Sequence, residues 1–418
     1  MFTLLFVAFL LTDVVLRLWL ASRQIRHVLR HRDQVPDAFA AKIGLYSHQR
    51  AADYTAAKMR LTIVERVTEA AVLVAFTLLG GLQFLDTRLG FLFDNEMLRQ
   101  LALLAVVFAI MGVIGLPFAV YNKFRLEQRF GFNRVTPRLF VMDCIKTLFL
   151  SLLLGTPLAA AVLWIMGNAG PAWVWWAWGI WVAFNILLLW LFPTVIAPLF
   201  NKFTPLENPE ISARINRLMQ RCGFSVKGLF VMDGSRRSAH GNAYFTGFGN
   251  ARRIVFFDTL LARLNGDEIE AVLAHELGHF KHRHILRRMV LSFASSLIFF
   301  LLLGWLSGQL WFYEGLGVTP QFGRPNDALA LLLFFLAMPV FTFWVTPLAA
   351  WLSRRDEFEA DRYAARQASA PALVSALVKL YDDNAATLTP DPVHSAFYDS
   401  HPSATQRIEH LQHATSRA

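Results

Sequence analysis

The sequence predicts a mainly helical protein that crosses a membrane several times and carries a small sheet-containing segment on one side. Three observations predict this class. The chain of 418 residues is 55% hydrophobic and only 17% charged, whereas about a quarter of the residues of an ordinary soluble domain are charged. Its apolar residues gather into stretches of about 20, the length that crosses a bilayer as a helix. Most polar residues lie in two segments, one before and one after the last pair of apolar stretches.

Seven stretches are apolar enough to span a membrane. They are Phe2 to Leu20, Ala70 to Phe93, Leu101 to Tyr121, Ile145 to Met166, Trp173 to Leu199, Met289 to Trp311 and Ala328 to Trp351. We do not expect the first to be a cleaved signal peptide, because a basic cluster follows it rather than precedes it.

The basic residues predict the orientation. They follow the first, third and fifth stretches, as Arg23, Arg26, Arg30 and Arg32, then Lys123, Arg125, Arg129, Arg134 and Arg138, then Lys202, Arg214, Arg217 and Arg221. By the positive-inside rule the amino terminus lies outside and the carboxyl terminus inside. The net charge of +10 then reflects topology and some attraction to anionic membrane lipid. No nucleic-acid-binding motif is present, so we expect no nucleic-acid partner.

One charged pair interrupts the first stretch. Asp13 and Arg17 are four residues apart and can pair on one helix face. Charged side chains at that depth usually face a polar interior, which predicts a water-accessible space among the helices. A locally satisfied pair near the interface is an equally good interpretation.

The predicted organisation has four parts: membrane helices over residues 1–200, a sheet-containing segment over 201–288, two further membrane helices over 289–351, and a carboxyl-terminal segment over 352–418. Within residues 201–288 the sequence pattern predicts a helix from Glu210 to Cys222. It also predicts three strands, over Val226 to Met232, Asn242 to Phe248 and Arg252 to Phe257.

A further helix is expected after the strands. Asp267 and Glu270 form a plausible capping box, and the pattern predicts one helix running from there into the sixth span. The seventh span should likewise continue as helix into the carboxyl-terminal segment, because neither Pro nor Gly interrupts Leu348 to Ala370.

The helix after the capping box contains His275-Glu276-Leu277-Gly278-His279, an H-E-x-x-H pattern. Two histidines four residues apart lie on one helix face, where both can reach one tetrahedral zinc ion. Glu276 lies beside them, close enough to deprotonate a water without being a ligand. The pattern therefore predicts a zinc site with Glu276 as the general base.

A catalytic zinc site needs a third protein ligand. The best candidates are Glu357 and Asp361, four residues apart just after the seventh span. One of them can bind zinc while the other hydrogen-bonds a ligand histidine. Taken alone, the same residues also fit a charged helix face with i,i+4 pairs.

Topology supports the pairing of the two motifs. His279 lies shortly before the sixth span and Glu357 shortly after the seventh. Because two crossings separate them, both fall on the same side of the membrane and can meet.

The other histidines are weaker candidates. We expect His282 and His284 to be solvated or to contact lipid headgroups. His394 and His401 lie near the chain end, with Arg407 beyond. A histidine or arginine brought near zinc could stabilise the oxyanion of a tetrahedral intermediate.

Taken together, these residues give the chain a resemblance to the type I CAAX prenyl proteases, integral-membrane zinc metallopeptidases of the farnesylated-protein-converting kind. The likeness covers most of the chain and extends beyond the zinc motif. It runs through Glu127 to Asn133, Pro198 to Leu206, Asp233 to Ser235, His240 to Phe245, Arg253 to Leu261, Ser353 to Asp361 and His401-Pro402.

The resemblance implies seven membrane helices around a water-filled chamber, capped by a gluzincin-like zinc protease domain with a small sheet. It implies one zinc ion per chain, held by the metal ligands His275, His279 and Glu357, with Glu276 as general base and Asp361 in support. It places His401 near the catalytic centre. The segment around Asn242 and Ala243 resembles the family's edge strand, against which a peptide adds as a further strand, and Arg407 is expected to bind substrate.

The implied function is hydrolysis of peptide bonds near the carboxyl terminus of membrane-associated or prenylated CAAX-type proteins. A short carboxyl terminus and the lack of a long insertion before His401 suggest a bacterial inner-membrane member. Alternatives from other classes are a seven-helix transporter or channel with a cytoplasmic regulatory domain, a quality-control protease without CAAX specificity, and a catalytically inactive homologue. The last of these predicts loss of a zinc ligand, whereas all three ligands are present.

Overall fold

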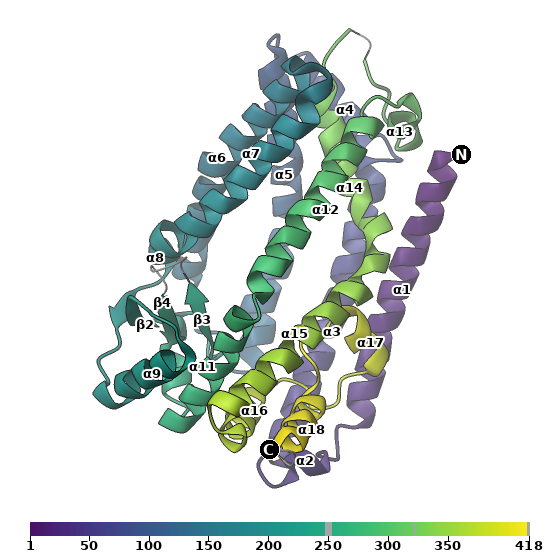
Figure 1. The fold of residues 1–418 in the computed structure, drawn as a ribbon. Helices are drawn as coiled ribbons and strands as arrows, with labels where there is room; N and C mark the ends of the chain where they lie inside the picture. Colours follow the sequence, from purple (N-terminus) through teal and green to yellow (C-terminus); the bar gives the residue numbers. More distant parts are fainter. Residues whose placement is uncertain (247–252, 322, 416–418) are drawn as a thin grey trace.

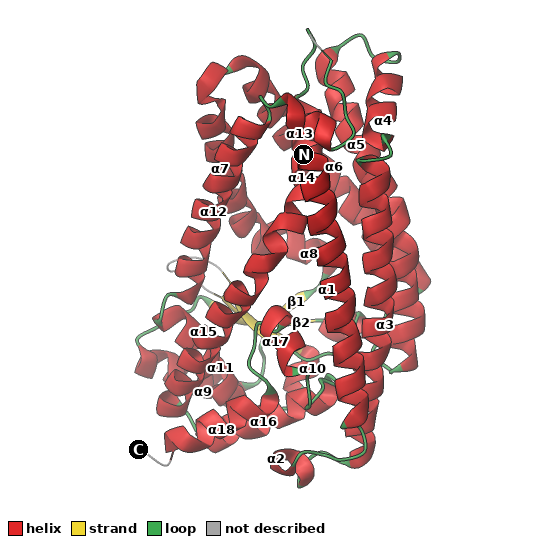
Figure 2. Cartoon of the chain, turned by 90° about the vertical axis from the view of Figure 1, so that its right-hand side faces the viewer, coloured by secondary structure: helices red, strands yellow, loops and turns green. Residues whose placement is uncertain are grey.

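Long helices form a bundle, and the sheet-containing part lies at the end of the bundle opposite the amino terminus (Figure 1). The structure is a computed structural model that describes residues 1–246, 253–321 and 323–415. Figure 2 shows the small sheet among short helices at this lower end, with α16 and α18 beyond it.

The bundle is built from the apolar stretches of the sequence. Its main helices are α1 (Phe2–Arg30), α3 (Leu45–Phe76), α4 (Gly81–Gly90), α5 (Glu96–Tyr121), α6 (Pro137–Asn168), α7 (Trp173–Leu191), α12 (His284–Leu306) and α14 (Asp327–Thr342). Shorter helical segments flank them: α2 (Asp37–Ala40), η1 (Asn122–Glu127), η2 (Gly170–Ala172), η3 (Phe192–Ile196), α8 (Ala197–Phe200), α13 (Leu310–Gly315) and η6 (Phe343–Val345).

Within the described residues, six helices are long and apolar enough to cross a membrane, and a seventh crossing arises if α3 and α4 count as one span. These two helices meet at a bend of 50°. The predicted span Ala70 to Phe93 is therefore broken, and α3 begins well before it. Gly80 at the break has φ +73°, a backbone conformation that residues with a side chain rarely adopt. At the next position, a Cβ on Gly81 would clash with the carbonyl oxygen of Ala75.

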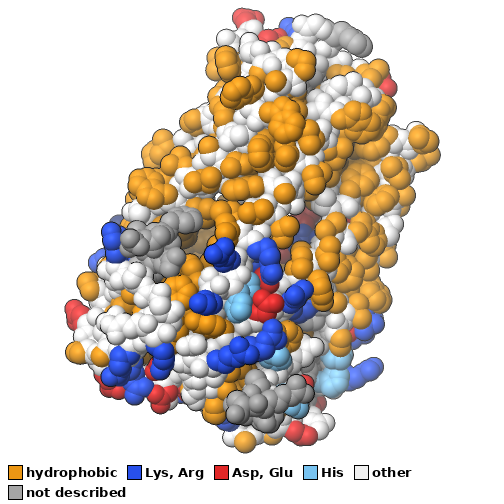
Figure 3. Space-filling view, viewed as in Figure 1, with side chains coloured by type: hydrophobic (Ala, Val, Ile, Leu, Met, Phe, Trp, Pro, Cys, Tyr) orange, Lys and Arg blue, Asp and Glu red, His pale blue; other side chains and the backbone are white. Residues whose placement is uncertain are grey.

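Apolar side chains cover most of the upper surface of the bundle, while charged and histidine side chains gather near its lower end (Figure 3). Many large apolar residues outside the core are exposed, such as Phe108, Phe149 and Trp190. An apolar surface of this extent needs a lipid environment. The protein is an integral membrane protein that crosses the bilayer several times.

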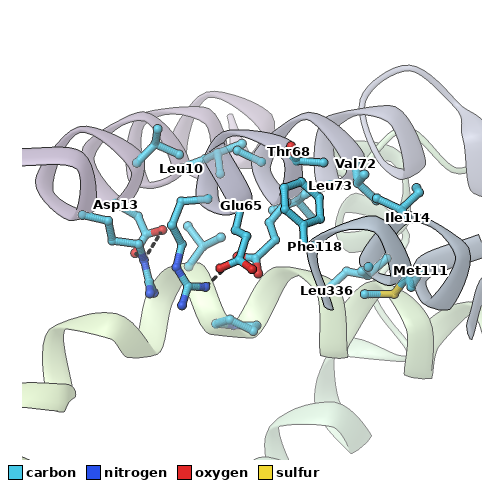
Figure 4. A pocket seen from close by; sticks show the side chains of 18 of the residues that line it. Leu10, Asp13, Glu65, Thr68, Val72, Leu73, Met111, Ile114, Phe118 and Leu336 are labelled. Carbon is cyan, nitrogen blue, oxygen red and sulfur yellow. Dashed lines mark hydrogen bonds and ion pairs between the residues drawn. The ribbon is translucent and has the colours of Figure 1, made fainter. Parts of the chain in front are cut away.

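A cavity of about 530 Å³ lies between α1, α3, α5 and α14 (Figure 4). Asp13 and Arg17 line it together with Glu65, Arg66 and Glu69 of α3. Arg17 Nε donates to both carboxylate oxygens of Asp13, at 2.8 and 2.9 Å. The pair therefore faces an internal space, as the first of its two interpretations predicted.

The lower end combines the polar segment before α12 with the chain after α14. Its helices are α9 (Pro209–Cys222), η4 (Gly234–Arg236), α10 (Asp258–Leu261), α11 (Gly266–Lys281), α15 (Thr346–Gln367), α16 (Ala370–Asp383), α17 (Pro392–Tyr398) and α18 (Ala404–Thr415). Its strands are β1 (Phe203–Pro205), β2 (Gly228–Met232), β3 (Ala243–Thr246) and β4 (Arg253–Phe257).

The four strands form one mixed sheet in the order β1-β2-β4-β3. β2 and β4 are parallel, and β1 and β3 pair antiparallel at the two edges. Strands β2, β3 and β4 match the predicted strands, although the end of the second and the start of the third lie outside the described residues. β1 was not predicted, because three residues that include a proline show no strand alternation.

Helix α11 packs on the sheet and carries the H-E-x-x-H pattern. Its capping box is formed by Asn265 and Glu268, since each side chain accepts a hydrogen bond from the other's backbone N–H. The predicted box of Asp267 and Glu270 was therefore wrong by two residues. The apolar face that includes Ile269 and Leu273 is buried with Ile254 and Phe256 of β4.

The chain does not continue as one helix from α11 into the sixth span, which corrects the prediction. Helix α11 ends at Lys281 and α12 begins at His284. Between them Arg283 adopts φ 55°, in the left-handed region that ends a right-handed helix. After the seventh span, by contrast, α15 is continuous from Thr346 to Gln367, and the predicted extension is confirmed.

Candidate metal centre

Two histidines project from adjacent turns of α11. His275 and His279 are four residues apart, and their Nε2 atoms are 3.3 Å apart. His275 is 7% exposed. Burial of this helix between the sheet and α15 holds both rings in place.

Helix α15 brings Glu357 against both rings. Its carboxylate oxygens lie 3.4 Å from His275 Nε2 and 3.4 Å from His279 Nε2. Glu357 is 3% exposed, and its Oε2 accepts no hydrogen bond among the described residues. A buried carboxylate oxygen without a hydrogen bond is costly unless a cation meets it.

The donor set fits one zinc ion. Ligand atoms at bonds of about 2.0–2.2 Å in a tetrahedron are about 3.3–3.6 Å apart. The three separations in this cluster, 3.3, 3.4 and 3.4 Å, match that spacing. Of the two candidates for the third ligand, Glu357 is the one that meets both histidines.

Asp361 lies behind His275, one turn beyond Glu357 on α15. Its Oδ1 is 2.8 Å from His275 Nδ1, the nitrogen that faces away from the cluster. Arg407 of α18 donates to the same carboxylate from Nε at 2.9 Å and Nη2 at 2.5 Å. Burial alone would raise the pKa of Asp361, but His275 and Arg407 outweigh it and lower the pKa to about 2.

Arg407 does not reach open space. It is 6% exposed, and its Nη1 lies 3.9 Å from Glu357 Oε2. Its charge faces Asp361 and Glu357, and the expectation that Arg407 binds substrate stays a prediction.

Glu276 follows His275 on α11 and is partly buried. Burial raises the pKa of its carboxyl group, while the neighbouring His275 and His279 act in the opposite direction. A carboxylate with a raised pKa is better matched to accepting a proton near neutral pH than an ordinary glutamate.

His401 approaches the cluster from a different side. It lies between α17 and α18, with Nε2 3.5 Å from Glu357 Oε1 and a side chain that is 61% exposed. His394 does not join the site: it packs against Tyr398, with ring centroids 4.8 Å apart.

Asn242 and Ala243 lie where strand β3 begins, and β3 is an edge strand. Asn242 C=O accepts a hydrogen bond from Phe257 N–H at 2.9 Å. Because inward and outward positions alternate along an antiparallel pair, Ala243 N–H points to the free edge. The Asn242 side-chain oxygen accepts a hydrogen bond from that N–H at 2.8 Å.

Two residues near the cluster were not predicted as part of it. His284 is 1% exposed, and its Nδ1 lies 2.9 Å from His279 Nδ1. Its Nε2 lies 3.0 Å from Glu359 Oε2. The prediction of a solvated His284 was wrong, whereas His282 is exposed as expected.

Two imidazoles and a carboxylate beneath a membrane bundle, with a glutamate next to one imidazole, define a membrane-embedded metallopeptidase. Comparison with known proteins specifies the family. Residues 24–202 match the model of the CAAX prenyl protease N-terminal region, described as five membrane helices, and residues 205–415 match peptidase family M48. The chain belongs to family M48, among the CAAX prenyl protease 1 proteins, which confirms the resemblance seen in the sequence.

Individual relatives agree over most of their length. A CAAX prenyl protease 1 homolog of Oryza sativa subsp. japonica is 38% identical over 80% of this chain and 78% of its own. CAAX prenyl protease 1 of Saccharomyces cerevisiae is 34% identical over 76% of this chain and 73% of its own. The crystal structure of S. mikatae Ste24p aligns with a TM-score of 0.90 at 29% identity, covering 98% of this chain and 99% of that one.

Proposed function

We propose that this metallopeptidase uses one zinc ion, held by His275, His279 and Glu357, to cleave peptide bonds near the carboxyl terminus of prenylated CAAX-type proteins. The observation that carries the zinc assignment is the triangle of donor atoms with edges of 3.3, 3.4 and 3.4 Å. A zinc ion bound by these residues would act as a Lewis acid, able to polarise a carbonyl group and to activate a water molecule.

Glu276 is the general base in this proposal. It takes a proton from the attacking water and passes it to the nitrogen of the leaving amine. Burial raises the pKa of Glu276 above the ordinary value for glutamate, and a raised pKa makes the carboxylate a stronger proton acceptor.

His401 is the residue proposed to meet the oxygen of the scissile carbonyl. It approaches Glu357 from the exposed side, so its ring can donate a hydrogen bond to negative charge that develops there. Asp361 and Arg407 hold His275 from behind.

The peptide is proposed to lie as an added strand along β3. Ala243 N–H points to the free edge and is held by Asn242 in the absence of a peptide. An extended substrate would exchange that hydrogen bond for one of its own, which is the usual mode of strand addition.

The substrate class rests on the names of the relatives, which are CAAX prenyl proteases. A prenylated protein is held at the membrane, and the donor cluster lies at the lower end of the membrane bundle. The basic residues near that end favour a cytoplasmic position for the site. Location in a bacterial inner membrane remains a prediction.

The test uses the purified protein in detergent or lipid vesicles with a fluorogenic CAAX peptide, prepared with and without a farnesyl group. We expect cleavage of the farnesylated peptide, and a fall in kcat of about 10²–10⁴-fold for Glu276→Gln without loss of bound zinc. Activity of Glu276→Gln equal to that of the wild type would overturn the mechanism. Equal cleavage of both peptides would overturn the prenyl requirement and favour a protease without CAAX specificity.

A further inference from the structure

The contact between His279 and His284 depends on the break between α11 and α12. Residues five apart on a continuous helix point about 140° away from each other, so their side chains do not meet. Here Arg283, with φ 55°, turns the chain between them, and His284 Nδ1 comes within 2.9 Å of His279 Nδ1. Left-handed backbone at a non-glycine residue often marks a functional constraint.

Hydrogen bonding along this chain of residues is consistent with one assignment of protons. His279 Nε2 faces His275 and Glu357, so Nε2 is the nitrogen available to a metal and Nδ1 carries the hydrogen. His279 Nδ1–H then donates to His284 Nδ1, which leaves the hydrogen of His284 on Nε2. His284 Nε2–H donates in turn to Glu359 Oε2 at 3.0 Å.

The arrangement on the other ligand is equivalent. His275 uses Nδ1 toward Asp361 at 2.8 Å, and Asp361 is held by Arg407. Each histidine ligand therefore has a polar partner on the nitrogen that faces away from the donor cluster. Such partners fix the tautomer and the ring orientation of a metal ligand.

A second cation site at His284, Asp356 and Glu359 is the competing interpretation, because their donor atoms lie within 4.8 Å of one another. Two guanidinium groups argue against it. Arg287 and Arg288 both contact Asp356, which is 1% exposed. The charge of Asp356 is thus already balanced, and both nitrogens of His284 are engaged.

We propose that His284, held by Glu359, is a positioning residue that fixes His279 for metal binding. The proposal rests on the zinc centre proposed above. It adds to that centre a residue that supports His279, as Asp361 supports His275. Loss of a supporting partner of this kind typically weakens metal affinity about 10–100-fold.

The proposal is tested on the full-length protein by chelator competition, which gives the dissociation constant of zinc without any measurement of activity. His284→Phe keeps an aromatic ring but removes both nitrogens, and we expect its zinc dissociation constant to rise about 10–100-fold. His284→Asn keeps an acceptor near the position of Nδ1 and should recover part of the affinity. His282 is a neighbouring histidine that is exposed. The matched control is therefore His282→Phe, which should bind zinc like the wild type.

Three further measurements separate positioning from loss of folding. Glu359→Gln keeps His284 in place with a weaker acceptor, and we expect a smaller rise in the dissociation constant than for His284→Phe. The visible absorption of the cobalt-substituted protein should shift in His284→Phe, because the ligand field follows ring orientation. Unfolding temperatures of the zinc-free variants show whether the fold is retained.

The outcomes distinguish the two proposals. A wild-type protein that binds no zinc overturns the metal centre and this proposal with it. A wild type that binds zinc, with His284→Phe and Glu359→Gln binding it equally tightly, overturns the positioning role alone.

Discussion

Gly278 and Ala360 bring α11 and α15 into backbone contact. A Cβ built on Gly278 would lie 2.8 Å from Ala360 Cα, and Ala360 is fully buried. This close approach lets the carboxylate of Glu357 reach both histidines, since Gly278 lies next to His279 and Ala360 one turn from Glu357.

We therefore predict that Gly278→Ala destabilises the protein and weakens metal binding. Alanine favours the helix by about 1 kcal/mol, but overpacking against backbone that cannot move costs about 1–3 kcal/mol. The net effect should be a lower unfolding temperature and a higher zinc dissociation constant. Gly112→Ala is the control, because among the described residues no atom beyond its own stretch of helix lies within 4 Å of a Cβ at Gly112. Unchanged zinc affinity in Gly278→Ala would show that the close approach does not set the ligand geometry.

The pairing of Arg407 with Asp361 yields a second prediction. Removing one partner of a buried ion pair leaves an unpaired charge and costs about 3–5 kcal/mol. Arg407→Met should lower both the unfolding temperature and the zinc affinity, and adding Asp361→Asn should recover part of the stability. If Arg407 contacts substrate instead, Arg407→Lys would raise KM and leave zinc affinity and stability unchanged.

The edge of β3 yields a third prediction. Asn242→Ala removes the side chain beside Ala243 N–H, where the proposed peptide strand binds. Because the peptide then no longer has to displace a competing hydrogen bond of about 0.5–1.5 kcal/mol, KM should fall about two- to tenfold and kcat should change little. Thr204→Ala, exposed on the opposite edge strand β1, should leave KM unchanged. A fall in kcat at constant KM would place Asn242 in the chemistry rather than in binding.

The ion pair between Arg23 and Asp391 yields a prediction about pH. Arg23 of α1 donates to Asp391 at 2.9 Å, and Asp391 is 2% exposed. Burial raises the pKa of Asp391, but Arg23 and the backbone N–H groups of His394 and Val393 outweigh it and lower the pKa. A carboxylate whose pKa is lowered by folding stabilises the fold above its unfolded pKa of about 3.9. This contribution is lost as the pH falls through the lowered value.

The free energy of unfolding of Asp391→Asn should therefore be lower than that of the wild type by about 1–3 kcal/mol at pH 7 and at pH 5. The variant should also unfold at a lower temperature. The difference should shrink as the pH falls below about 4. Asp33→Asn, with a carboxylate that is 80% exposed, should show no such difference. A gap between wild type and Asp391→Asn that stays constant down to pH 3 would mean that charge does not carry the effect.

Much of the candidate site followed from short-range patterns. The spacing of His275 and His279 is a property of one helix, and the two crossings before Glu357 placed all three on one side of the membrane. The choice between Glu357 and Asp361 needed the structure. Both lie on one face of α15, and the packing of α15 on α11 decides which carboxylate meets both rings.

The parts that the sequence did not predict depend on backbone breaks. The turn at Arg283 has no glycine or proline to signal it, so α11 and α12 were expected to be continuous. A continuous helix would direct His284 away from His279, which is why His284 was assigned to solvent. The bend between α3 and α4 was also missed. Apolar residues lie on both sides of Gly80, and a hydropathy profile does not reveal a change in the direction of the helix axis.

The proposed mechanism depends on one zinc ion held by His275, His279 and Glu357. X-ray absorption at the zinc edge of the purified protein tests it most directly, together with the zinc content of the wild type and of Glu357→Gln. We expect one zinc per chain, two imidazole nitrogens and carboxylate or water oxygens as ligands, and a marked loss of zinc in Glu357→Gln. Sulfur ligands, or a zinc content that Glu357→Gln leaves unchanged with the same spectrum, would contradict it.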